Sequence, residues 1–225
     1  FLEASLTAGA DYIATGHYAR VVHESSSSAK LLRARDDNKD QTYFLYRVTS
    51  EALSKTIFPL GDFTKAEVRE MAKERGLWTA SKKESMGICF VGQVGIREFL
   101  SEYVKTAPGN IIDQQTGSVV GKHGGAIFYT LGQRHGLNIG GGLPYYVVGK
   151  DMEKNEVYVS RSIDNDNLWR KELGLADIHW INQAPHKDKY VQVRLRQRGA
   201  LVDAKIDGDI VHLSASERAV AAGQS

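Results

Sequence analysis

The segment FLEASLTAGADYIATGHYAR, residues 1–20, decides the fold class of this chain. Its first ten residues repeat apolar side chains at near-helical spacing, which predicts a helix. The apolar residues 12–14 then predict a short buried strand, and residues 15–17 follow where that strand ends. A helix followed by a strand and a turn is typical of an α/β domain with parallel strands.

The α/β pattern continues along the chain from this segment. The four serines at residues 25–28 separate two apolar runs and predict the tip of a flexible hairpin. Thr64 and Glu67 have the spacing of a capping box that opens an amphipathic helix, and Gly76 predicts its end. Residues 96–104 predict a further helix, after which the pattern changes.

Beyond residues 108–109 (Pro-Gly), turn residues separate short strands and helical periodicity is weak. Residues 145–148 and 157–159 predict a β-hairpin. Residues 191–197 alternate between apolar and polar side chains and predict a strand with one basic face. The Asp-Gly pair at residues 207–208 predicts the turn of the next hairpin. We therefore expect a small C-terminal β-barrel whose basic side faces outward.

The composition is that of a globular protein, with 225 residues of which 42% are hydrophobic and 25% charged. No run approaches the roughly 18 apolar residues of a membrane span, and none resembles a signal peptide, so we expect a cytoplasmic protein. The formal net charge of +2 is too small to indicate nucleic-acid binding by itself. Basic residues must therefore be considered locally.

Cys89 is the only cysteine, which excludes an internal disulfide and argues against a cysteine-based zinc site. It lies in SMGICFVG, residues 85–92, between two glycines and after Lys82 and Lys83. These residues leave two roles open. Free cysteines are usually small buried apolar side chains. Alternatively, the glycines present the thiol, and a nearby cation favours the thiolate, which is the nucleophilic form.

Two further segments suit phosphate or nucleotide binding. Gly16 and His17 follow a predicted parallel strand, where ligands bind in open α/β sheets and glycine permits close approach. Residues 39–41 (Lys-Asp-Gln) precede a predicted helix start and offer a cation and an amide. The alternatives are a glycine turn with a surface histidine, and a solvated helix start.

The glycine triplet at residues 140–142 lacks a Walker lysine and a dinucleotide fingerprint, so we assign no nucleotide to it. The densest basic region is residues 187–198, with five basic residues, one acid and Tyr190. Arg194 and Arg196 are expected on one strand face, where they could bridge adjacent phosphates. A solvated outer face explains the same residues equally well.

Taken together, the motifs resemble the tRNA-specific 2-thiouridylase family in order and approximate spacing. They are ATGHYAR (residues 14–20), NKDQTYFL (38–45), SMGICFVG (85–92) and YTLGQR (129–134), and PYYVV (144–148) and AGQS (222–225) extend the match. The resemblance covers nearly the whole chain. Because of this resemblance, we favour a functional role for Gly16, Lys39 and Cys89 over the purely structural alternatives.

The resemblance implies an α/β plus β fold in three parts. Residues 1–106 would be the remainder of a PP-loop ATP pyrophosphatase domain, of the adenine nucleotide alpha-hydrolase-like type, that carries Cys89. Residues 107–166 would be a small central domain, and residues 167–225 an incomplete C-terminal β-barrel. The family's Ser-Gly-Gly-x-Asp-Ser phosphate loop and its second cysteine would precede Phe1, so we expect a truncated chain that is inactive by itself.

The resemblance also implies an activity. In this family, ATP adenylates the C2 oxygen of the wobble uridine of tRNA and a cysteine persulfide supplies sulfur to C2. By this carry-over Cys89 is the persulfide carrier, and Gly16 contacts ATP, with Mg²⁺ implied by the ATP chemistry. The residues expected to contact tRNA are His17, Lys39, Asp40, Gln41, Arg194, Leu195, Arg196, Gln197 and Gln224.

The expected partners are tRNA and a persulfide-donating sulfur-relay protein or cysteine desulfurase, with no membrane and no DNA. One competing hypothesis is a non-catalytic tRNA-binding module in which Cys89 only packs. Another keeps the PP-loop fold but changes the substrate, as in amide-forming ATP pyrophosphatases, which need no cysteine at this position.

Overall fold

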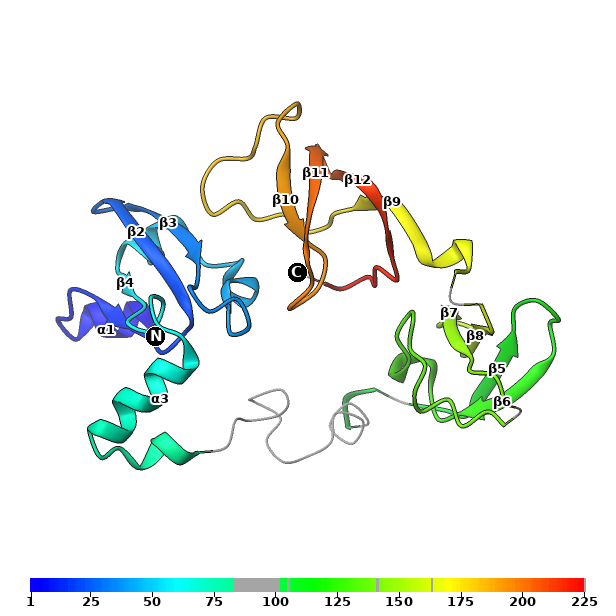
Figure 1. Cartoon of the computed structure of the whole chain (residues 1–225). Helices are drawn as coiled ribbons and strands as arrows, with labels where there is room; N and C mark the ends of the chain where they lie inside the picture. Colours follow the sequence, from blue (N-terminus) through cyan, green and yellow to red (C-terminus); the bar gives the residue numbers. More distant parts are fainter. Residues whose placement is uncertain (83–101, 105, 141, 163, 225) are drawn as a thin grey trace. The chain divides into compact units, whose positions relative to one another are not determined.

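The computed structural model describes residues 1–82, 102–104, 106–140, 142–162 and 164–224 (Figure 1). The chain divides into two compact units. Unit 1 comprises residues 1–83 and 174–212, and unit 2 comprises residues 84–173 and 213–224. Among the described residues, no helix is long and apolar enough to cross a membrane.

Unit 1 begins with the predicted helix and strand. Helix α1 (Leu2–Thr7) leads into β1 (Ile13–Ala14), which pairs in parallel with β4 (Thr56–Ile57). The parallel strand is confirmed, but the prediction that it is buried is wrong, since Ile13 is half-buried and Ala14 is exposed. The reason is that β1 and β4 form a sheet of two strands in the described part of the chain, too narrow to bury both faces.

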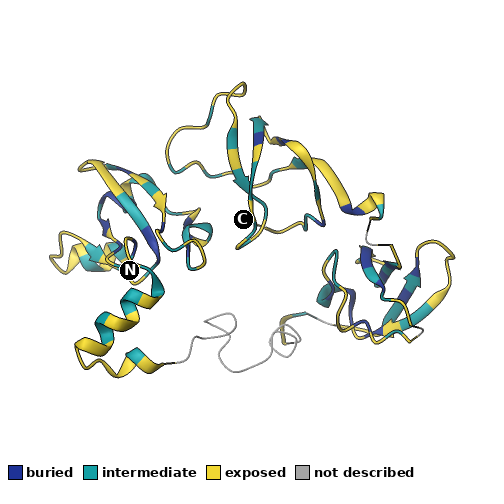
Figure 2. Cartoon of the chain, viewed as in Figure 1, coloured by how far each residue is buried: buried dark blue, intermediate teal, exposed yellow. Residues whose placement is uncertain are grey.

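The serine-rich segment forms the predicted hairpin tip. Strand β2 (Ala19–Ser25) pairs antiparallel with β3 (Ser28–Arg33), and helix α2 (Ser50–Ser54) packs beside them. The core of this region consists of Ala19, Ala29, Leu45, Leu53 and Phe58 (Figure 2). The apolar side of the hairpin is therefore covered by α2 and by the residues around it.

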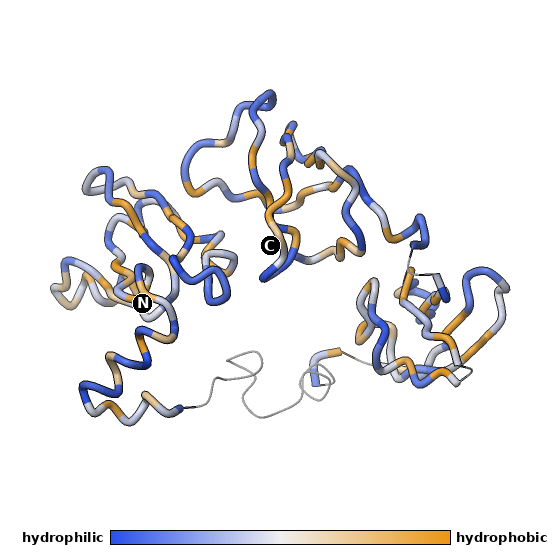
Figure 3. The backbone as a smooth tube through the Cα atoms, in the orientation of Figure 1, coloured by the Kyte–Doolittle hydropathy of each residue, from blue (hydrophilic) through white to orange (hydrophobic). Residues whose placement is uncertain are grey.

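The capping box is confirmed at the start of α3 (Lys65–Glu74). The Thr64 hydroxyl accepts a 3.3 Å hydrogen bond from Glu67 N, and the Glu67 carboxylate accepts a 2.6 Å bond from Thr64 N. The backbone N–H and the hydroxyl of Thr64 both donate to the Glu67 carboxylate and lower the pKa of that carboxyl. Helix α3 mixes polar and apolar residues along its length (Figure 3), and Gly76 follows it with φ of +64°.

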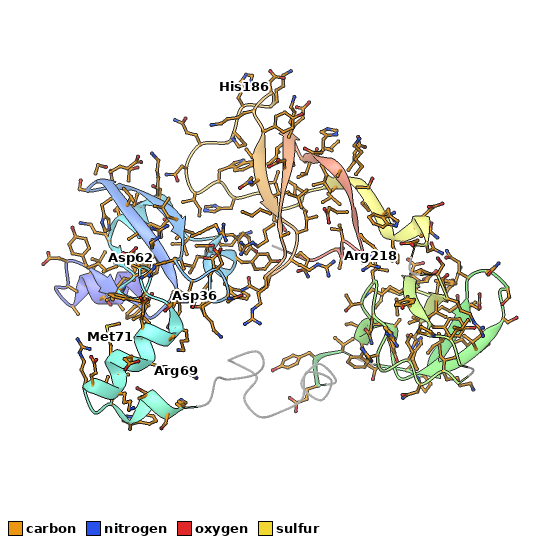
Figure 4. All side chains as sticks on the ribbon, viewed as in Figure 1. Asp36, Asp62, Arg69, Met71, His186 and Arg218 are labelled. Carbon is orange, nitrogen blue, oxygen red and sulfur yellow. The ribbon has the colours of Figure 1, made fainter. Side chains whose placement is uncertain are left out.

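Short 3₁₀ helices complete this part of unit 1. They are η1 (Thr42–Leu45) and η2 (Trp78–Ser81). Asp36, labelled in Figure 4, accepts a 2.9 Å hydrogen bond from Lys65 N and so fixes the loop after β3 to the start of α3. Most of the predicted helix at residues 96–104 lies outside the described residues.

Unit 2 is built on a four-stranded sheet with the order β6-β5-β8-β7. The strands are β5 (Gly109–Asp113), β6 (Val119–His123), β7 (Tyr146–Asp151) and β8 (Glu156–Ser160), and the 3₁₀ helix η3 (Ala126–Phe128) follows β6. The predicted hairpin is confirmed as β7–β8. Ile111, Val147, Val157 and Val159 are fully buried and form the centre of its core.

The last strands form a sheet with the order β10-β11-β12-β9. They are β9 (Trp169–Gly174), β10 (Val191–Arg194), β11 (Leu201–Asp207) and β12 (Ile210–Arg218), and η4 (Asp166–Leu168) precedes them. The hairpin β11–β12 is confirmed, although its turn lies at residues 208–209, one residue later than predicted.

The predicted strand at residues 191–197 is too long, because β10 ends at Arg194. Residues 195–198 form a turn in which Gly199 N donates a 2.9 Å hydrogen bond to Arg196 O. Arg198 has φ of +61°, a conformation that a strand does not contain. The expected strand face shared by Arg194 and Arg196 is therefore absent.

Candidate functional site

The buried carboxylate of Asp40 is the centre of the candidate site. Asp40 lies in the loop between β3 and η1 and is 1% exposed. Its Oδ1 accepts hydrogen bonds from Ala34 N at 3.2 Å and from the Thr42 hydroxyl at 2.9 Å. Its Oδ2 lies 3.1 Å from Arg194 Nη1 and 3.5 Å from Arg33 Nε. Two cations and two neutral donors thus offset the cost of burying this charge.

The contact with Asp40 explains where Arg194 lies. Arg194 is the last residue of β10, and its side chain is only 13% exposed because it contacts the buried Asp40 carboxylate. The prediction that Arg194 belongs to an outward basic face is therefore wrong. Gln197 follows in the turn, and its Nε2 donates a 3.2 Å hydrogen bond to Asp40 O. Residues 39–41 and 194–197, both expected to bind tRNA, thus come together in unit 1.

A pocket of about 240 Å³ opens beside Asp40. Its lining contains two guanidinium groups, one carboxylate, two phenol rings and polar or apolar neighbours. The lining residues are Arg33, Asp40, Thr42, Tyr43, Tyr46, Gln192, Arg194 and Leu201. The charged groups of the lining sum to a single positive charge, which suits an anionic ligand.

Gln41 connects this site to the segment that contains Gly16 and His17. Its backbone N–H donates to Tyr18 O at 2.9 Å, and its side-chain Oε1 accepts from Tyr18 N at 2.9 Å. The His17 Nδ1 lies 2.9 Å from the Thr15 hydroxyl oxygen, and its ring meets Phe58 edge-on. The predicted residues His17, Lys39, Asp40 and Gln41 therefore belong to one bonded region of unit 1.

Gly16 is exposed and lies two residues after Ala14, the last residue of the parallel strand β1. A Cβ atom at this position would meet only Leu60 Cδ1, at 3.9 Å. The backbone is therefore open on this side, as close approach by a nucleotide requires. This geometry fits the expected contact between Gly16 and ATP, with the backbone as the contacting group.

Among the described residues of unit 1, Leu195 and Arg196 are not part of the pocket lining. Leu195 is half-buried and Arg196 is exposed in the turn after β10. Lys187 and Lys189 lie on the exposed loop that precedes β10 and carries His186 at the position labelled in Figure 4. Gln224 belongs to unit 2. Cys89, the expected sulfur carrier, lies outside the described residues.

Sequence reasoning missed Arg33, Tyr46 and Gln192, which line the pocket. The signal that could have found Tyr46 is the aromatic cluster in TYFLY, residues 42–46, directly after the Lys-Asp-Gln segment. Arg33 and Gln192 carry no such signal, because each is one polar residue within a short strand.

Comparison with known proteins gives three consecutive family matches. Residues 1–93 match a tRNA methyl transferase HUP domain, residues 97–161 a tRNA methyl transferase PRC-barrel domain, and residues 170–225 an aminomethyltransferase beta-barrel domain. The predicted fold class, an α/β part followed by a central domain and a C-terminal β-barrel, is confirmed. The domain boundaries at residues 106 and 166 stay a prediction.

Relatives named tRNA-specific 2-thiouridylase MnmA match over the full length of this chain. The protein of Bacillus cytotoxicus is 44% identical over 232 residues, and those of Bacillus thuringiensis and Bacillus anthracis are 46% identical. In each case the match covers 100% of this chain and 62% of the relative. Three domain matches in sequence and this level of identity show that the chain belongs to the tRNA-specific 2-thiouridylase family.

Proposed function

We propose that this protein catalyses the ATP-dependent 2-thiolation of the wobble uridine of tRNA. The observation that carries the proposal is the contact between Asp40 and Arg194. It joins two segments, 154 residues apart, that the family resemblance independently assigns to tRNA binding. The family matches support the same activity, which is named in the relatives. The chain spans 62% of the length of those relatives, so the activity is assigned to the full-length protein.

The chemistry follows from the need to replace a poor leaving group. ATP bound with Mg²⁺ would transfer its adenylyl group to the C2 oxygen of uridine and release pyrophosphate, so that this oxygen could leave as part of AMP. The terminal sulfur of a persulfide on Cys89 then attacks C2, and the bond between C2 and oxygen breaks. A second thiol must reduce the sulfur–sulfur bond that remains. Dividing the substitution in this way is the advantage of covalent catalysis.

The described residues have a separate task in this proposal, which is to hold the RNA. The Asp40 cluster positions the segment after β3 against the end of β10. Gln41 and His17 extend this region toward Gly16, whose open backbone would face ATP. The base to be modified must leave its stack to reach both the nucleotide and the sulfur. We place this activity in the cytoplasm, with a persulfide-donating relay protein or a cysteine desulfurase as the source of sulfur.

The test uses the full-length protein with Cys89→Ser. We expect 2-thiouridine formation to fall by several orders of magnitude, because an alcohol cannot carry a persulfide. Binding of tRNA should stay unchanged. Ser85→Ala is the matched control, since it alters the same motif without removing sulfur. Undiminished thiolation by the Cys89→Ser protein would leave the chain as a tRNA-binding module in which Cys89 only packs.

A further inference from the structure

Arg33 and Tyr46 have no role in the function proposed above, yet both line the pocket beside Asp40. The Arg33 side chain is 42% exposed although its Nε lies 3.5 Å from a fully buried carboxylate. The protein therefore fixes the guanidinium at Nε, while Nη2 pairs with the exposed carboxylate of Asp37. A cation held in this way is prepared for an anion without a further loss of side-chain freedom.

The charge of the pocket suits a single phosphate. Asp40 neutralises one of the two lining arginines, Arg33 and Arg194, and one positive charge remains. Asp37 lies 2.5 Å from Arg33 Nη2, but its side chain is 76% exposed. Solvent screens such an exposed pair and makes it weak, so an RNA phosphate can compete with Asp37 for the guanidinium.

Aromatic rings lie beside this cation. Tyr43 and Tyr46 line the same pocket as Arg33, and Tyr46 is 42% exposed. Proteins that bind single-stranded RNA combine a basic groove with aromatic rings on which unpaired bases stack. The pocket of about 240 Å³ is smaller than the roughly 300–1,000 Å³ of pockets that enclose a small molecule, so a nucleotide would bind against it through its phosphate and one face of its base.

We propose that Arg33 and Tyr46 bind one unpaired nucleotide of the tRNA, with its phosphate on Arg33 and its base on Tyr46. Asp40 is the positioning residue of this subsite: it lies beneath the two arginines, 1% exposed, and orients them without touching RNA. The inference rests on the proposed function, because it takes tRNA as the partner. It adds a contact that none of the sequence motifs assigns.

The first experiment measures tRNA affinity of the full-length protein as a function of salt, with Arg33→Ala. We expect about tenfold weaker binding and a salt slope reduced by about one, the signature of one lost phosphate contact. Arg33→Lys should restore most of the slope. Arg35→Ala is the matched control: Arg35 is 56% exposed, pairs with Glu67 at 3.2 Å and lies outside the pocket lining. It should leave affinity and slope unchanged.

The second experiment separates stacking from charge. Tyr46→Ala should weaken binding about five- to a hundredfold with the salt slope unchanged, whereas Tyr46→Phe should bind like the parent, because stacking needs the ring and not the hydroxyl. Asp40→Asn tests the positioning role, because the direction of the change in RNA affinity distinguishes two explanations. Removing a negative charge alone would tighten RNA binding, whereas loss of arginine positioning weakens it, and we expect weaker binding.

The outcomes distinguish this inference from the function on which it rests. A parent protein that fails to bind tRNA would overturn the proposed function. If the parent binds tRNA but Arg33→Ala and Arg35→Ala have equal affinity and slope, the inference alone is wrong. Tighter binding by Asp40→Asn would remove the positioning role. Thermal unfolding of each variant checks that the variant is folded under the conditions of the binding measurement.

Discussion

The side-chain amide of Asn182 donates a 3.1 Å hydrogen bond to the backbone oxygen of Ala29, although 153 residues separate them. The Ser50 hydroxyl donates a second hydrogen bond to the Ala29 oxygen at 2.9 Å. Asn182 Nδ2 also lies 3.3 Å from the Ser50 hydroxyl oxygen. Ile181 packs against the core beside β3. The segment after β9 is therefore bonded to the β2–β3 hairpin.

We predict that Asn182→Ala lowers the free energy of unfolding by about 1 kcal/mol, the usual net value of such a hydrogen bond. Chemical denaturation of the purified protein measures the change. Gln183→Ala is the control, because the neighbouring Gln183 is exposed. Equal stability of the two variants would show that the Asn182 contact contributes nothing.

A second prediction concerns the buried pair of Asp40 and Arg194. Arg194→Ala should destabilise unit 1 by about 3 kcal/mol, because it removes one of the two cations that offset a buried charge. Asp40→Asn in the same chain should recover part of this loss, since the uncompensated charge is then gone. Denaturation of the two single variants and the double variant gives the coupling energy. Additive effects would contradict a direct interaction.

Gly61 provides a prediction about close backbone packing. A Cβ atom there would lie 1.9 Å from Ala19 O, so the chain must shift to accept any side chain. We expect Gly61→Ala to cost about 2 kcal/mol or more of stability, as overpacking does. Gly174→Ala is the matched control, because a Cβ at Gly174 meets nothing within 4 Å. A Gly61→Ala protein as stable as the parent would show that residue 61 and the Ala19 oxygen are not so closely packed in solution.

His123 makes unit 2 sensitive to acid. Burial lowers the pKa of its imidazole below the ordinary value, and Nδ1 accepts a 3.0 Å hydrogen bond from Gly125 N, which requires the neutral ring. A lowered folded-state pKa means that the unfolded chain takes up the proton first. Stability should therefore fall as the pH drops below about 6.5, by at most about 1.4 kcal/mol per pH unit for one proton.

The measurement is the stability of unit 2 between about pH 7.5 and 5.5, a range chosen around the ordinary histidine pKa. His123→Gln should reduce the dependence on pH, whereas His135→Gln, at an exposed position, should leave it unchanged. The comparison between variants matters because carboxyl groups also titrate toward acid pH. Identical pH profiles for all three proteins would rule out His123 as the sensitive group.

Local features of the fold were predictable from the sequence. Thr64 and Glu67 lie within one helical turn and hydrogen-bond to each other, and the serines at residues 25–28 form the tip of a hairpin between two neighbouring apolar runs. The β7–β8 hairpin followed from two adjacent apolar runs. Each of these structures is determined by neighbours in the chain, which is what a pattern of residues encodes.

Features that depend on distant residues were not predictable. The alternation at residues 191–197 indicates a longer strand, but β10 ends where Arg194 turns inward to Asp40. No local pattern signals that an aspartate far away needs this cation. For the same reason the pocket beside Asp40 was missed, since its lining combines residues near 33–46 with residues near 192–201.

Unit 1 is assembled from two stretches of chain, residues 1–83 and 174–212, and the stretch between them belongs to unit 2. During synthesis on the ribosome, the first stretch emerges before Arg194 and Asn182, which contact Asp40 and Ala29, have been made. At the usual elongation rate of about 5–20 residues per second, about 8 to 30 seconds pass before Asn182 and Arg194 are made. During this interval Asp40 has Arg33 but not Arg194 beside it, and the Ala29 oxygen has Ser50 but not Asn182, so nascent unit 1 lacks the contacts that fix residues 174–212 to the hairpin.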